Sequence, residues 1–167
     1  MKLDGRNRFL GWLQRMLDRA LRFRTRPLRV KILCLEAYIA LLASHFFVFF
    51  VPFRYLAKWA STLRPRKAKS GSPQLLEELS WAIDTGCRYS CWRQTCLTRA
   101  VAGKALLHRR GYASIIVLGM EPLGIDEVKA HAWLVCEKGI VLGRDGMSKC
   151  RPIASFGRFR TAGPEVK

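Results

Sequence analysis

The pattern of apolar and polar positions changes once along the chain, from long helical periodicities to short strand-like runs. Residues 8–23 place apolar side chains at helical spacing with arginines between them, and Pro27 ends this pattern. Residues 30–51 form a nearly continuous apolar run that Pro52 closes, and a short helix is predicted over 53–60. The first third of the chain is therefore predicted to be helical.

A second pair of helices is predicted in the middle of the chain. Residues 74–85 have a helical pattern, with Ser72 as a candidate cap and Gly86 as the predicted end. The periodicity of residues 96–109 predicts the next helix, which the glycine of the Arg-Arg-Gly sequence at 109–111 ends. Small residues along this second helix would allow it to pack closely.

Strand-like runs follow at 113–118, 130–136 and 140–143. The Glu-Lys-Gly sequence at 137–139 predicts a tight hairpin between the last two. A helix followed by a small antiparallel sheet is an α+β arrangement, here preceded by an α-helical amino-terminal region.

Proline, glycine, serine and charge are concentrated at 64–73, which predicts an exposed linker. The linker separates a helical, basic and apolar region at 1–63 from a compact core at 74–167. A chain of 167 residues with 50% hydrophobic residues can fill one core of this kind without disulfides or metal.

The apolar run at 30–51 has more than one interpretation. A membrane-spanning helix needs about 20 apolar residues, so the run is long enough, but Glu36, Ser44 and His45 interrupt it. A buried helix and an interfacial helix are the alternatives. The basic amphipathic segment at 8–23 likewise suits a membrane surface, a partner or packing against the next helix.

The net charge of +18 indicates an acidic partner, which could be a nucleic acid, an anionic membrane surface or an acidic peptide. Much of the excess lies before residue 70. Nucleic acid is the weakest of the three, because the basic residues are not interleaved with a recognition module. We therefore expect no nucleic-acid partner.

Six cysteines are spread along the chain, and its first residues are too polar and basic for a secretory signal. We expect reduced thiols and a cytoplasmic protein. The cluster at Cys87, Cys91 and Cys96 lacks the paired spacing of a zinc site, so no metal is expected.

Three residues have the order needed for nucleophilic catalysis by a thiol. Cys96 lies where a loop enters a helix, with Thr95 as a candidate cap, and the helix dipole would favour its thiolate. His131 begins a strand, and Asp145 lies on or just beyond the neighbouring strand. Such a carboxylate can hold an imidazole that acts as a base.

The amino-acid sequences of two segments carry a family resemblance. The run CWRQTCLTRAVAGKALLHRRG at 91–111, with AHAW at 130–133, resembles the leader peptidase of lasso-peptide biosynthesis. The resemblance extends over roughly residues 28–156 and includes the Pro-Phe-Arg sequence at 52–54. It implies a transglutaminase- and papain-like core, in which a catalytic helix packs on a small antiparallel sheet.

The resemblance also implies the roles of the site residues. Cys96 would be the nucleophile, His131 the general base and acid, and Asp145 the orienting carboxylate. In that family the aspartate usually follows a glycine directly, whereas Arg144 stands between Gly143 and Asp145 here. The Cys96 amide, helped by Gln94 or Trp92, would stabilise the oxyanion, and Trp133 is a further candidate for substrate contact.

The implied reaction is thiolate attack on a peptide carbonyl, release of one segment from an acyl-enzyme, and hydrolysis by water, which needs no cofactor. The resemblance implies a ribosomally made precursor as substrate, a separate leader-binding recognition protein and an ATP-using cyclase as partners. Two other functions remain open: a non-catalytic protein that anchors to a membrane surface or a complex, and a transglutaminase or amidase on the same triad.

Overall fold

The computed structural model describes residues 27–63, 72–122 and 128–157. The chain divides into two units, residues 1–32 and residues 33–167. Only the first turn of one helix belongs to the described part of the first unit, so the architecture below is that of the second. The predicted amphipathic segment at 8–23, and residues 64–71 of the predicted linker, lie outside the described residues.

Five helices and four strands are described. The helices are α2 (Leu28–Phe50), α3 (Phe53–Thr62), α4 (Pro73–Tyr89), α5 (Cys96–Arg109) and α6 (Arg144–Met147). The strands are β1 (Ser114–Pro122), β2 (Val128–Cys136), β3 (Gly139–Leu142) and β4 (Arg151–Phe156). They form one antiparallel sheet in the order β3-β2-β1-β4. The α+β class predicted from the sequence is confirmed.

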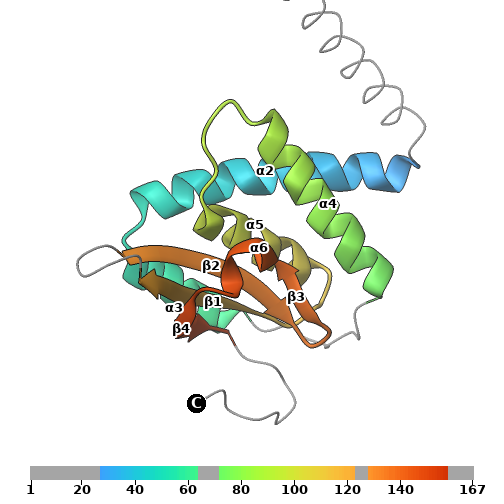
Figure 1. The fold of residues 1–167 in the computed structure, drawn as a ribbon. Helices are drawn as coiled ribbons and strands as arrows, with labels where there is room; N and C mark the ends of the chain where they lie inside the picture. The colour runs from blue at the N-terminus through green and yellow to red at the C-terminus, as the bar shows by residue number, and fades with distance from the viewer. Residues whose placement is uncertain (1–26, 64–71, 123–127, 158–167) are drawn as a thin grey trace, which may run out of the picture. The chain divides into compact units, whose positions relative to one another are not determined.

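The sheet separates helices α5 and α6. Helix α5 packs behind the sheet and the short helix α6 lies in front of it (Figure 1). The core fills the space between the sheet, α5, α4 and the inner faces of α2 and α3. Two residues of β2, Ala132 and Leu134, project into this core.

Close packing fixes α5 against the sheet. A side chain at Gly103 would place its Cβ 2.5 Å from Leu142 Cδ1 and 2.7 Å from Leu134 Cδ2. Only a glycine lets the helix approach this closely, because any larger residue would displace two buried leucines. The neighbouring positions are also buried, so the helix has almost no freedom to slide.

Helix α4 continues beyond Gly86 to Tyr89, so the prediction that it ends at Gly86 was wrong. A Cβ at Gly86 would lie 2.7 Å from Leu41 Cδ1 of α2. The glycine therefore serves the contact between two helices instead of ending one of them. Two further elements, β4 and α6, were not predicted from the sequence.

Helix α2 has one buried and one exposed apolar face. Its inner face buries Leu33, Ala37, Leu41 and Ser44. The residues on its other face within the second unit are 37% to 77% exposed: Leu35, Ile39, Leu42, Phe46, Phe49 and Phe50. The helix is long and apolar enough to cross a membrane, a test that the core helices of soluble proteins also pass.

A buried lysine joins α5 to the sheet. Lys104 is 1% exposed, and its Nζ donates a hydrogen bond to the Ser114 carbonyl over 2.5 Å. A Cβ at Gly157 would lie 2.8 Å from the same nitrogen, so the backbone after β4 closes over it. Burial lowers the pKa of Lys104 from 10.5 to about 8.

This pKa predicts how stability depends on pH. Because the folded pKa lies below the unfolded value, the unfolded chain binds more protons between them, so the stability that Lys104 contributes rises with pH above about 8. Relative to Lys104→Met, the wild-type free energy of unfolding should increase by about 2 to 3 kcal/mol between about pH 7 and pH 10. Urea unfolding of both proteins at several pH values measures the difference, and a constant difference would contradict the assignment.

Candidate catalytic site

Cys96 is the first residue of α5, as predicted. The helix begins there because the Thr95 side chain accepts a hydrogen bond from the Thr98 amide over 3.1 Å. The sulfur of Cys96 is half-buried beside the core, and the thiol is free. The amino terminus of a 14-residue helix stabilises negative charge at such a position.

His131 lies in β2 and is held by a backbone carbonyl. Its Nε2 lies 2.8 Å from the oxygen of Gly143. A carbonyl oxygen can only accept, so Nε2 carries the proton and Nδ1 of the neutral ring is left as the acceptor. His131 also stacks on Trp133, with 6.0 Å between ring centroids and an interplanar angle of 25°.

The short helix α6 covers the His131 ring. A Cβ at Gly146 would lie 2.9 Å from both Cε1 and Nε2 of His131. Side chains alternate along a strand, so His131 and Trp133 project from the face opposite to Ala132 and Leu134. His131 thus faces α6, whereas the core residues of β2 face α5.

Helix α5 runs along β2 from the His131 end to the Cys136 end. Lys104, in the second half of the helix, is bonded to Ser114, and Ser114 pairs with Cys136 at the end of β2. Arg99, one turn after Cys96, lines a pocket with Gly143, whose carbonyl bonds His131, so the start of α5 lies towards the end of β2 that carries His131. No hydrogen bond joins Cys96 to His131 among the described residues.

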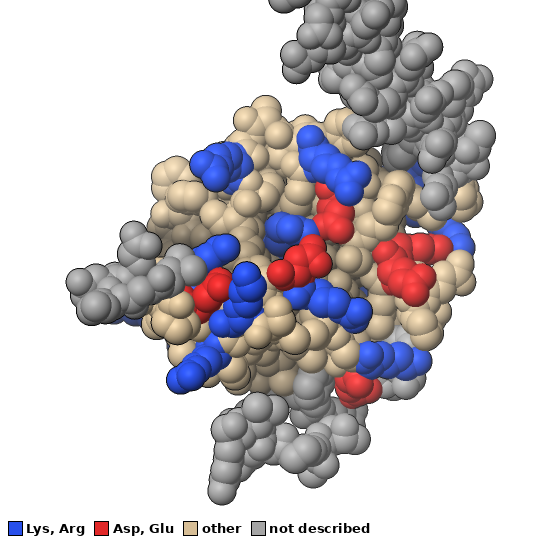
Figure 2. Space-filling model, in the orientation of Figure 1, with Lys and Arg blue, Asp and Glu red and all other residues tan. Residues whose placement is uncertain are grey.

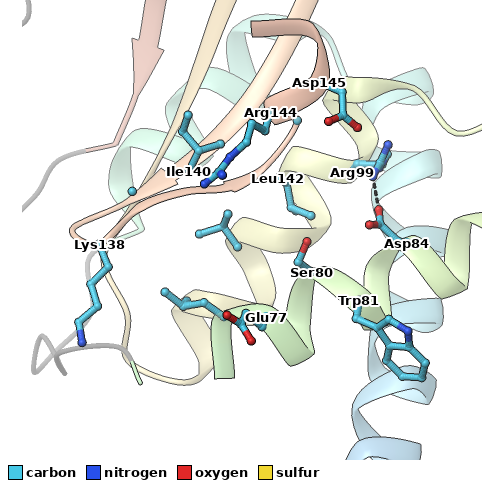
Figure 3. A pocket seen from close by; sticks show the side chains of 14 residues that line it. Glu77, Ser80, Trp81, Asp84, Arg99, Lys138, Ile140, Leu142, Arg144 and Asp145 are labelled. Atoms are coloured by element: carbon cyan, nitrogen blue, oxygen red, sulfur yellow. Dashed lines mark hydrogen bonds and ion pairs between the residues drawn. The ribbon is translucent and has the colours of Figure 1, made fainter. Parts of the chain in front are cut away.

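Asp145 reaches the same end of the sheet from α6. It lines a pocket together with Arg99, which is one turn along α5 from Cys96. The carboxylate of Asp145 is turned towards Arg99, and Arg99 forms an ion pair with Asp84 (Figure 3). In the structure the Gly143 carbonyl, not Asp145, holds the imidazole, so the orienting role of Asp145 stays a prediction.

The loop before Cys96 carries the predicted oxyanion residues. Gln94 Nε2 donates to Ser90 Oγ over 3.2 Å, and Ser90 Oγ in turn donates to the Gly86 carbonyl over 2.7 Å. This chain of hydrogen bonds uses one amide hydrogen of Gln94 and leaves the second for a ligand.

Trp92 connects this loop to α2. Its ring packs against Tyr38 and His45, with centroid separations of 5.7 and 5.8 Å. The Nε1 atom of Trp92 is buried and has no hydrogen-bond partner among the described residues. A buried indole N–H normally has a partner, which makes this donor one that a bound oxygen atom could satisfy.

Two other residues near the site have structural roles. Trp133 is 5% exposed and packs over Gly119, where a Cβ would lie 2.6 Å from its ring. The buried Trp133 indole therefore supports the His131 ring that stacks on it. Burial raises the pKa of the Cys87 thiol. The Arg99 guanidinium lowers this pKa, and the Asp84 carboxylate raises it. Cys87 is thus kept as a protonated thiol beside the Arg99–Asp84 pair.

Three features of the site were missed from the sequence: the Gly143 carbonyl, the contact of Gly146 with His131, and the ion pair of Arg99 with Asp84. Gly143 has a φ of 83°, and a Cβ there would lie 2.8 Å from the Ala132 carbonyl. A glycine directly after a strand is the one signal that could have indicated a tight turn at this point. The other two contacts join residues far apart in the sequence, and no local pattern indicates them.

Comparison with known proteins identifies the family. Residues 40–155 match the model of the transglutaminase-like superfamily, from the middle of α2 to β4. This range includes Cys96, His131 and Asp145. No curated protein and no solved structure matches the chain.

The position of Gly146 allows the His131 geometry to be tested. In Gly146→Ala the added methyl group should displace the imidazole and lengthen its bond to the Gly143 carbonyl. Nitrogen NMR of the ring should show the Nε2-protonated tautomer in the wild type and a mixture in the variant. Ser148→Ala, an exposed change at the end of α6, is the control. A wild-type ring protonated on Nδ1 when neutral would contradict this geometry.

Proposed function

The chain belongs to the transglutaminase-like superfamily, whose members are generally cysteine peptidases or acyltransferases, and from this premise we propose that it removes the leader from a ribosomally made lasso-peptide precursor. The observation that carries the proposal is the meeting of three elements at one end of the sheet. These are the start of α5 with Cys96, the first half of β2 with His131, and α6 with Asp145.

Each residue has a role in the proposed reaction. The Cys96 thiolate attacks the carbonyl carbon of the scissile bond, and His131 donates a proton to the departing amine. Water, deprotonated by His131, then hydrolyses the thioester and releases the leader's carboxylate. The protonated Nε2 on the Gly143 carbonyl supports this role, because it leaves Nδ1 as the acceptor of the transferred proton.

The tetrahedral intermediate needs donors for its oxyanion. The Cys96 amide lies at the start of a helix, where the amide hydrogens have no partner within the helix. The free amide hydrogen of Gln94 and the unpartnered Nε1 of Trp92 are the side-chain donors on the same loop. Trp133 contributes by supporting His131, because its indole is buried beneath the ring.

Asp145 completes the proposed triad when α6 moves. In the structure its carboxylate faces Arg99, and the Gly143 carbonyl holds His131 (Figure 3). The proposed triad requires a movement of the four-residue α6 that brings Asp145 to the imidazole in place of the Gly143 carbonyl. Substrate binding beside α6 would supply the energy for this change.

The proposal includes partners that supply and consume the peptide. A leader-binding recognition protein presents the precursor, and an ATP-dependent cyclase closes the macrolactam after cleavage. The same triad can transfer an acyl group to an amine instead of water, so a transglutaminase or amidase activity is the nearest enzymatic alternative.

A second function, anchoring to a membrane surface, is favoured by the exposed face of α2. Six large apolar side chains on this face are at least 37% exposed, and Arg54 and Lys58 lie exposed on the adjacent α3. Soluble monomers rarely expose an apolar surface of this extent, and basic residues beside it suit anionic lipid.

Cleavage of a precursor distinguishes the two functions. A lasso-peptide precursor, incubated with its recognition protein and this protein, should give one cut between leader and core by mass spectrometry. Cys96→Ala should reduce the rate by roughly a thousandfold or more, because the nucleophile is lost. Cys91→Ala, an exposed cysteine on the same loop, is the matched control and should cut normally.

Equal cutting by wild type and Cys96→Ala would contradict the peptidase proposal. An intact precursor with both proteins, together with sedimentation of both on anionic vesicles, would favour the anchoring function instead. An amine adduct on the released leader would indicate acyl transfer.

A further inference from the structure

A groove beside the candidate site remains without a function. It has a volume of about 520 Å³ and lies between α4 and β3 (Figure 3). Leu76, Ser80 and Trp81 form the α4 wall, and Gly139–Leu142 form the other wall. We propose that this groove binds an extended segment of the peptide substrate as an additional strand on the free edge of β3.

The free edge of β3 provides the backbone chemistry. β3 is the last strand of the sheet and pairs with β2 on one side only. Beyond this pairing, its residues make no hydrogen bond with any described residue. An edge strand presents unpaired N–H and C=O groups that bind an extended peptide backbone without requiring a particular sequence.

One end of the groove, here called its head, lies beside the proposed catalytic residues. Arg99 and Asp145 line this end, and so does Gly143, whose carbonyl holds His131. Arg99 follows Cys96 by one helical turn. A strand bound along β3 would therefore lead the peptide to the first turn of α5, where the nucleophile lies.

The walls of the groove suit a peptide and not a polyanion. Leu76, Ile140 and Val141 line the groove with apolar side chains that a side chain of the bound strand can contact. Charges of both signs line the groove, and basic and acidic side chains are interspersed on this face of the molecule (Figure 2). A phosphate backbone requires basic residues without such acidic neighbours.

This inference rests on the proposed peptidase function for the identity of the peptide. The Arg99–Asp84 ion pair closes the groove on the α5 side and keeps the Arg99 guanidinium at its head. Strand pairing would also place the substrate against α6, the element that must move for Asp145 to reach His131.

Backbone N-methylation tests the strand pairing. Fluorescein-labelled precursor peptides, each with one N-methylated residue within four positions of the cleavage site, are titrated into Cys96→Ala protein and cleaved by wild type. N-methylation removes one backbone donor and leaves the side chains unchanged. Affinity and cleavage should fall at least tenfold at alternate positions on one side of the cut only, because every second residue of a strand faces its neighbour.

A groove-filling variant provides the second test. Ser80→Trp should raise KM at least tenfold with little change in kcat, because it blocks binding and leaves Cys96 and His131 untouched. Ser61→Trp, the same substitution at an exposed position of α3, should change neither constant. Circular dichroism and thermal unfolding establish that both variants are folded.

The outcomes separate this inference from the proposed function. Cys96-dependent cleavage that is insensitive to N-methylation and to Ser80→Trp would overturn the groove and leave the peptidase standing. Binding with the alternating pattern, but without Cys96-dependent cleavage, would support the groove and overturn the peptidase. Absence of both binding and cleavage would overturn both.

Discussion

The burial of α5 between the sheet and α4 is the constraint on which the site depends. Gly103 lets the helix approach β2 and β3 until the leucines of both strands touch its backbone. Lys104 then ties the second half of the helix to the start of β1. These contacts fix the position of the helix on the sheet, and the Thr95 cap sets its start at Cys96. Packing contacts two turns away therefore hold in place the helix that carries Cys96, the proposed nucleophile.

The chemistry of the site depends on how three separate elements end or begin. Cys96 opens a helix, His131 lies near the start of a strand, and α6 follows directly after the edge strand β3. The antiparallel β2–β3 hairpin folds the chain back so that Gly143 and His131 are bonded although they are 12 residues apart. α6 contacts His131, and its Asp145 carboxylate is turned towards Arg99 of α5. The proposed triad requires a movement of this helix that changes the partner of His131 from a carbonyl to a carboxylate.

Local sequence patterns predicted the helices and strands that carry the site. The features that these patterns did not predict depend on contacts between residues far apart in the sequence. The bounds of α5, the Thr95 cap, the hairpin at 137–139 and the position of Asp145 just beyond β3 all follow from short-range rules. Gly86 was read as a helix end because a local rule cannot reveal the close approach of Leu41. β4 was missed because it contains Pro152 and is stabilised by pairing with β1 across more than 30 residues. The partner of His131 was missed as well, because the sequence does not show which backbone carbonyl a distant side chain contacts.

Covalent labelling by a substrate-like electrophile tests whether Cys96 is a nucleophile assisted by His131. A leader peptide that carries a vinyl sulfone in place of the scissile carbonyl is mixed with the protein, and adducts are located by tandem mass spectrometry. We expect one adduct, on Cys96 and on none of the other five cysteines, and labelling at least tenfold slower in His131→Ala. Labelling of a different cysteine, or an unchanged rate without His131, would contradict this assignment.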